Sequence, residues 1–87
     1  MRTYRIYAER FGVRSEITSV VRRYFSAFTV YSGQGFWKGG AEDTDIIEII
    51  DTEDQLQYVV HLAGDLKELG KQSEVLVTSS PVTVVKV

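Results

Sequence analysis

The sequence predicts an α+β protein with a ferredoxin-like βαββαβ order, in which two helices cover one face of a four-stranded antiparallel sheet. Two observations lead to this fold class. Segments in which apolar and polar residues alternate are interspersed with two segments whose apolar residues recur at helical spacing. The chain has 87 residues, enough for one domain, residues 1–87. With the two helices as right-handed crossovers, the expected spatial order is 4-1-3-2.

The first strand is expected at Thr3–Glu9, where apolar and polar side chains alternate. A helix should follow, with Ser15 as its N-cap and Glu16 in the first turn, where an acidic side chain suits the helix dipole. Its apolar stripe follows helical spacing: Ile17, Val20, Val21, Tyr24 and Phe28.

The middle of the chain predicts a hairpin from about Phe28 to Asp51. Four glycines lie in the run Gly33–Gly40. Because glycine within strands marks bends and bulges, we expect a long or bulged tip. The returning segment Asp45–Ile50 is apolar on both faces apart from Glu48, which suits a central strand.

The second helix is predicted to begin at a capping box of Thr52 and Gln55 and to end at Gly70. A fourth strand, Glu74–Ser80, precedes a proline and a short extra C-terminal strand of mostly valine, Val82–Val87. The expected core consists of Tyr4, Ile6, Ala8, Ile17, Val20, Val21, Tyr24, Phe28, Val30, Ile46, Ile50, Leu56, Val59, Val60, Ala63, Leu66, Val75 and Val77.

The composition, with 44% apolar and 25% charged residues, is typical of a globular protein. Cysteine is absent, which excludes disulfides and cysteine nucleophiles. No apolar run approaches the roughly 18 residues of a membrane span, so we expect a cytoplasmic protein in a host cell. Residues 1–40 carry seven basic and two acidic side chains, whereas residues 41–87 carry ten acidic and three basic ones. We expect the two sets to neutralise each other within the fold; one-sided binding of a charged partner is the alternative.

No motif specifies a reaction. His61, the only histidine, is expected on a mixed flank of the second helix beside Asp65, with no nucleophile specified near it. Seven acids lie within residues 42–54, but their spacing does not match an EF-hand loop. The glycine run lacks the P-loop pattern. We therefore expect a protein that is not an enzyme, with no catalytic residue, no metal site and no cofactor.

Aromatic side chains on the open face of the sheet and at the hairpin tip are the strongest candidates for a contact site. RNA-recognition motifs stack bases on such a face, but the acidic and aliphatic third strand and the net charge of −2 argue against nucleic acid. Aromatic and cationic residues dominate protein-binding hot spots, although Trp37 could instead fold into the core. The predicted partner-binding residues are Arg5, Tyr7, Tyr31, Phe36, Trp37 and Lys38.

Three segments together resemble a group of short, mostly uncharacterised proteins encoded by phages and prophages. These segments are the run Gly33–Gly40, with its Gly-Phe-Trp-Lys-Gly motif, the strand Asp45–Ile50, and Lys71–Thr78. In that group a Gly-x-Trp-Lys-Gly hairpin precedes an isoleucine-rich strand and a Gln-Glu-x-Val-Leu-Val-Thr strand. Here Ser73 separates the glutamine from the glutamate. The resemblance implies a phage accessory protein, and it brings no activity and no catalytic residues.

We therefore expect a non-enzymatic protein that binds and blocks, or scaffolds, a host macromolecule, as counter-defence proteins of the anti-CRISPR type do. One alternative is a protein that binds or sequesters a nucleotide-like signal, with Trp37 or Tyr31 stacking a base and Arg5 or Lys38 holding phosphate. A small hydrolase using His61 is another. The C-terminal valines and the open sheet face also predict a homodimer, because both need a cover.

Overall fold

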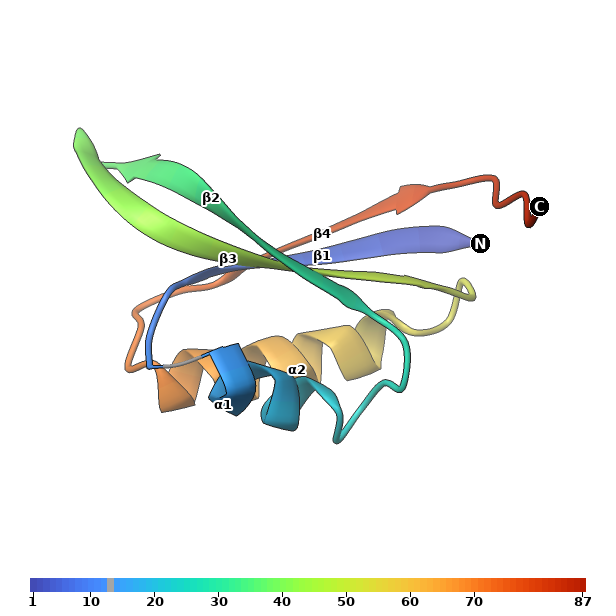
Figure 1. Cartoon of the computed structure of the whole chain (residues 1–87), viewed down its shortest axis with the longest axis horizontal. Coiled ribbons are helices and arrows are strands. Elements are labelled where there is room, and N and C mark those ends of the chain that lie inside the picture. The colour runs from blue at the N-terminus through green and yellow to red at the C-terminus, as the bar shows by residue number, and fades with distance from the viewer. Residues whose placement is uncertain (13) are drawn as a thin grey trace.

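The computed structural model describes residues 1–12 and 14–87. In these residues an antiparallel sheet is covered by two helices, both on one face (Figure 1). The sheet has the order β2-β3-β1-β4, which is the expected order read from the opposite edge. The elements along the chain are β1 (Arg2–Glu9), α1 (Arg14–Val21), β2 (Thr29–Trp37), β3 (Gly40–Asp51), α2 (Leu56–Leu69) and β4 (Leu76–Pro81). Neither helix is long and apolar enough to cross a membrane.

The core lies between the helices and one face of the sheet. The residues of β3 that point into this core are not the ones predicted. Ile47 and Ile49 are buried against the helices, whereas Ile46 is buried on the opposite face and Ile50 is 45% exposed. Cross-strand pairing fixes this phase, because Ile47 lies opposite the buried Ile6 of β1, and paired residues share a face. When isoleucine occupies both faces of a strand, the sequence alone does not show which face is turned toward the helices.

Both helix starts also differ from the prediction. Ser15 lies inside the first turn of α1 instead of capping it, and α1 ends at Val21. Tyr24 and Phe28, expected in that helix, follow it and pack half-buried against the core. In α2 the N-cap is Gln55, whose side chain makes no capping bond, so the expected capping box does not form.

The buried residues of α2 differ in part from the expected core. Leu62 is fully buried, whereas Leu56 and Val60 are exposed. Two details agree with the prediction: Gly70 is the C-cap, and Val59 and Leu66 are buried. The hydroxyl of Tyr24 donates to Asp65 Oδ2 of α2 at 2.5 Å, which links the segment after α1 to α2.

The hairpin of β2 and β3 closes with a tight turn, not with the long or bulged tip expected. Trp37 pairs with Gly40, and the register runs without a bulge to Thr29 opposite Glu48. The turn residues Lys38 and Gly39 have φ values of 50° and 80°. Left-handed conformations at both turn positions match the twist of the strands, which is why such turns favour glycine.

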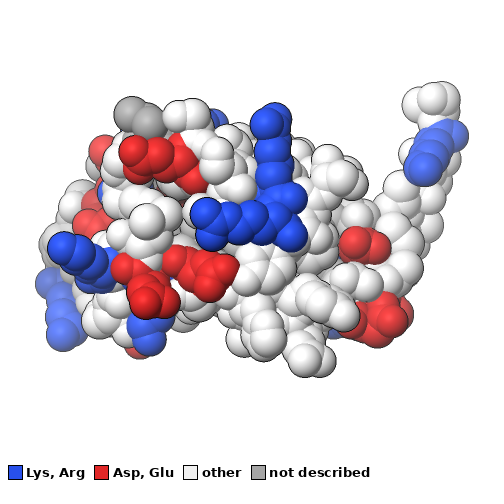
Figure 2. Space-filling view, turned by 90° about the horizontal axis from the view of Figure 1, so that it is seen from below, with Lys and Arg blue, Asp and Glu red and all other residues white. Residues whose placement is uncertain are grey.

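The valine-rich segment Val82–Val87 is not a strand, contrary to the prediction. Strand β1 begins at Arg2, which pairs with Pro81, so the tail has almost no neighbouring backbone left to pair with. A single bond continues the ladder, from the Val82 amide to the Met1 carbonyl at 3.1 Å. The tail then projects beyond the body of the molecule (Figures 1 and 2).

The ion pairs of the described residues join the two halves of the sequence. Each has its basic partner among residues 1–14 and its acidic partner among residues 45–53. Part of the basic excess of residues 1–40 is thus paired with acids of the second half, while Arg22, Arg23 and Lys38 take part in none of these ion pairs. On the face covered by the helices, basic and acidic side chains lie interspersed (Figure 2).

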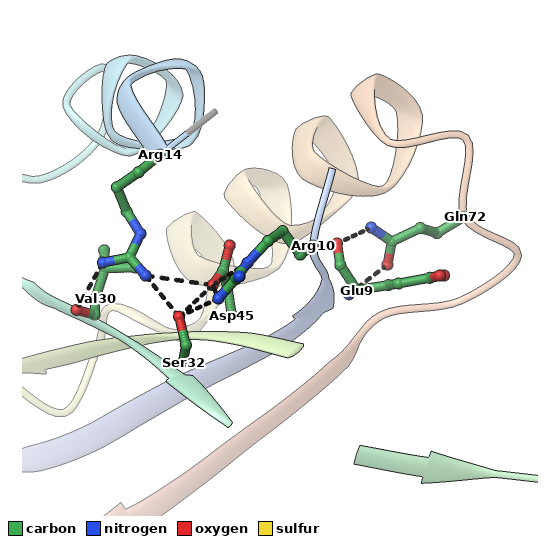
Figure 3. Close-up of polar contacts among 7 residues, drawn as sticks. All are labelled: Glu9, Arg10, Arg14, Val30, Ser32, Asp45 and Gln72. Carbon is green, nitrogen blue, oxygen red and sulfur yellow. Dashed lines mark hydrogen bonds and ion pairs between the residues drawn. The ribbon is translucent and has the colours of Figure 1, made fainter. Parts of the chain in front are cut away.

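The most buried charge is Asp45 on β3, whose side chain is 1% exposed. Its Oδ1 accepts hydrogen bonds from Ser32 at 3.0 Å, from Arg10 at 3.3 Å and from Arg14 at 3.5 Å (Figure 3). Arg10 and Arg14 also bond to the Ser32 hydroxyl. One carboxylate therefore joins the end of β1, the start of α1, β2 and β3.

We predict that Asp45→Asn lowers the free energy of unfolding by about 1–3 kcal/mol, because two guanidinium groups lose their charged acceptor. The neighbouring Asp43 is exposed, and the same change there, Asp43→Asn, is the matched control with an expected effect near zero. Urea denaturation followed by circular dichroism measures both values. Equal stabilities of the two variants would contradict this account of Asp45.

Candidate functional site

A groove of about 640 Å³ lies on the open face of the sheet. The hairpin of β2 and β3 extends past the other strands and curls away from the helices, forming one wall (Figure 1). The opposite wall is the loop Lys71–Glu74, between α2 and β4. The groove thus opens on the side of the sheet that no helix covers.

Two glycines in β2 create the depth of the groove. Gly33 and Gly35 lie between Tyr31 and Trp37 on the open face, where they add no side chain. A Cβ atom at Gly35 would lie 2.7 Å from Thr44 Oγ1 on the adjacent strand. A side chain at Gly35 would therefore have to displace the Thr44 side chain, and the absent side chains leave the hollow.

The groove lining combines aromatic and acidic side chains. Phe36 and Trp37, 71% and 52% exposed, contribute aromatic surface near the hairpin tip. The titratable side chains apart from Tyr7 are three carboxylates and one amine, so the lining is acidic overall. The aromatic and charged side chains of the lining are Tyr7, Glu9, Phe36, Trp37, Glu42, Lys71 and Glu74.

The loop wall is attached to β1 through Gln72. Its Nε2 donates to the Glu9 carbonyl at 2.9 Å, and its Oε1 accepts from the Glu9 amide at 3.1 Å (Figure 3). The main chain of the loop is held to α2, since the Gln72 amide donates to the Lys67 carbonyl at 3.0 Å. The loop is thereby bonded to both neighbouring elements.

Of the six residues predicted as a contact site, three line the groove: Tyr7, Phe36 and Trp37. Trp37 is largely exposed, so the alternative that it belongs to the core is wrong. Lys38 occupies the hairpin turn. Sequence reasoning missed the groove acids and Gln72; the spacing of Gly33 and Gly35 was the available signal for a hollow.

Arg5 and Tyr31 form a separate polar cluster with Glu48 in the middle of the open face. Arg5 donates to Glu48 Oε2 at 2.9 Å, and the Tyr31 hydroxyl donates to the same atom at 3.4 Å. The hydrogen bond that Arg5 donates to Glu48 raises the pKa of the Arg5 guanidinium above its ordinary value. Arg5 therefore has a carboxylate partner within the chain.

The other candidates from the sequence lie apart from this groove. His61 is exposed on α2, on the side of the sheet opposite to the groove. Within residues 1–12 and 14–87, no three histidine or acidic side chains come together as metal ligands would.

Known proteins share this fold. A phage SAM lyase in its apo state superimposes with a TM-score of 0.74 and 18% identity, covering 91% of this chain and 78% of that one. A DUF3240 family protein from Shewanella baltica gives a TM-score of 0.71 with 14% identity, covering 99% and 94%. A de novo designed protein, Foldit4, gives 0.52 with 26% identity, covering 94% and 96%. No family model and no curated protein matches the sequence.

We predict that Gly35→Val lowers the free energy of unfolding by about 1–3 kcal/mol, since a branched side chain overpacks the space beside Thr44. Gly64→Ala on α2 is the matched control, because its Cβ would meet no atom within 4 Å. Alanine there should stabilise the protein by about 0.5–1 kcal/mol through helix propensity. Urea denaturation of both variants tests the opposite signs, and a stable Gly35→Val protein would contradict the packing at the groove floor.

Proposed function

We propose that this protein binds a small organic cation carrying an aromatic ring, in the groove between the hairpin and the Lys71–Glu74 loop. The observation that carries the proposal is the groove itself, with about 640 Å³ of space beside exposed aromatic side chains. Volumes of roughly 300–1,000 Å³ are typical of small-molecule sites. The exposed indole of Trp37 offers a surface on which a planar ring can stack.

The charges of the lining favour a cationic ligand. Glu9, Glu42 and Glu74 take part in none of the ion pairs of the described residues, whereas the buried Asp45 and the half-buried Glu48 both have arginine partners. Carboxylates without a cation, next to aromatic faces, attract positive groups through charge and through cation–π contact.

The same charges argue against a phosphate-bearing ligand in this groove. Lys71 is its only amine or guanidinium among the described lining residues. Arg5, one expected phosphate partner, is engaged by Glu48. A nucleoside-like ligand without phosphate therefore fits the lining better than a nucleotide.

The similarity of fold to the phage protein suggests which ligand to test first. The phage protein of similar fold is a SAM lyase by name. S-adenosylmethionine joins an adenine ring to a sulfonium cation and carries no phosphate, which is the combination that the lining favours. We propose that this protein, acting as a phage accessory protein, binds and sequesters S-adenosylmethionine or a compound of its class.

Isothermal titration calorimetry tests the proposal with S-adenosylmethionine and its neutral thioether analogue, S-adenosylhomocysteine. We expect the sulfonium compound to bind at least tenfold more tightly. Trp37→Ala should weaken its binding about tenfold, the loss typical of removing one base–aromatic stack. Tyr58 is similarly exposed, on the far side of the sheet, so Tyr58→Ala is the control with unchanged affinity.

Two results would overturn parts of this proposal separately. No binding of either compound by the folded protein removes S-adenosylmethionine as the ligand. Equal binding of both compounds keeps the groove as a nucleoside site but removes its selection for a cation.

Exposed apolar side chains favour a second candidate, a macromolecular partner. Phe36 is 71% exposed at the hairpin tip, and Leu76 lies exposed on β4. We propose that this surface binds a host protein, the function expected from the sequence. The homodimer also remains a proposal, supported by Val84 and Val85, which are exposed in the tail.

Affinity capture from host lysate, with mass spectrometry, tests the second candidate. A specific partner should be retained by the wild-type protein and by Tyr58→Ala, and its recovery should fall about tenfold with Phe36→Ala, in the range of an interface hot spot. Undiminished recovery with Phe36→Ala would show that the hairpin tip does not bind that partner.

A further inference from the structure

We infer that the side-chain amide of Gln72 takes the place of a missing peptide group in the sheet, and that it thereby positions the outer wall of the groove. Gln72 is a positioning residue in this inference. Its effect on ligand affinity rests on the proposed function, whereas its structural role does not.

The strand register shows where the peptide group is missing. Strand β4 pairs with β1 from Arg2 opposite Pro81 to Tyr7 opposite Leu76. Continued by two residues, this register would place Glu74 opposite Glu9. Strand β4 begins only at Leu76, however, while β1 continues to Glu9 and pairs with Thr44 on its other side. The backbone of Glu9 is therefore left without a strand on the β4 side.

The Gln72 amide supplies the two bonds that the strand would have made. It accepts from the Glu9 amide at 3.1 Å and donates to the Glu9 carbonyl at 2.9 Å, as an antiparallel neighbour would (Figure 3). A primary amide carries the same donor and acceptor as a peptide group, so it fits this role. The main chain of the loop can then leave the sheet, and Glu74 lines the groove instead of pairing.

A glycine makes room for this contact. A Cβ atom at Gly70 would lie 2.7 Å from Gln72 Nε2 and 2.7 Å from Phe11 Cδ1. Gly70 has an ordinary helical φ of −84°, so a larger residue there would meet no backbone strain but would displace one or both of these side chains. The glycine at the C-terminus of α2 thus leaves space that the Gln72 side chain occupies.

The bonds of Gln72 fix the width of the groove, because the two walls belong to different parts of the chain. One wall is the hairpin, which is held by pairing within the sheet. The other is the Lys71–Glu74 loop, and its described bond to β1 is this amide contact. Without it, the loop would keep its main-chain bonds to α2 and the pairing that starts at Leu76, but it would lose its bonds to Glu9 of β1.

Gln72→Ala tests the inference with two readouts. Exchange of the Glu9 amide proton, followed by NMR without ligand, should become at least tenfold faster, because its acceptor is lost. The affinity for S-adenosylmethionine should fall about tenfold, the value expected when two neutral hydrogen bonds are removed. Gln57→Ala, at an exposed position on α2, is the control that should change neither.

Gln72→Glu gives a readout that a loss of packing would not produce. A protonated carboxyl group can still donate to the Glu9 carbonyl, whereas a carboxylate cannot. Relative to wild type at the same pH, the affinity of this variant should approach that of wild type below the ordinary glutamate pKa of about 4.3 and fall about tenfold above it. Gln72→Ala should show no such dependence.

The outcomes separate the inference from the proposed function. Unchanged Glu9 exchange in Gln72→Ala overturns the role of the amide in the sheet. Faster exchange with unchanged affinity overturns its role in positioning the groove wall. Failure of the wild-type protein to bind S-adenosylmethionine overturns the proposed ligand, and the exchange measurement then still decides the structural role of Gln72.

Discussion

The burial of one carboxylate, that of Asp45, is the constraint on which the hairpin and the first helix depend. A carboxylate removed from water is strongly destabilising unless charged or polar partners replace its hydration. Arg10, Arg14 and Ser32 replace it, and they come from three different segments. These segments must therefore meet at one atom. A one-residue slip of β3 would move Asp45 to the open face and leave both arginines without their acceptor.

The same constraint determines which side chains face the groove. With Asp45 on the helix side, Ile47 and Ile49 follow it into the core. Through the pairing of β2 with β3, Gly33, Gly35 and Trp37 then lie on the open face. The hollow is therefore a consequence of the buried charge on the other side of the same strands. The same strand register therefore determines both the packing on the helix side of the sheet and the lining of the groove on its open side.

Much of the fold could be predicted from local patterns, and the errors come from tertiary contacts. The alternation in β1 and the helical spacing of Val59, Ala63 and Leu66 identify their elements because one face of each is apolar. Which face of β3 is turned toward the helices could not be predicted, because isoleucine occupies both of its faces. The C-terminal valines suggested a strand, but β1 offers them no further backbone.

The candidate site could be predicted only in part, for a similar reason. Exposed aromatic residues beside glycines indicated the hairpin tip. The opposite wall depends on where β4 starts, which is a property of the whole sheet. Nothing local to Gln72 distinguishes it from a surface glutamine, since its role depends on Glu9, 63 residues away in sequence.

The ion pairs between the two halves of the chain also bear on the order of events during synthesis. Arg5, Arg10 and Arg14 leave the ribosome well before Asp45 and Glu48, their partners in the folded protein. A nascent chain of the first 40 residues carries an excess of positive charge and lacks β3, the strand that pairs with both β1 and β2. The sheet cannot assemble stepwise from the N-terminus. It forms when the acidic half emerges, so that folding awaits the second half of the chain.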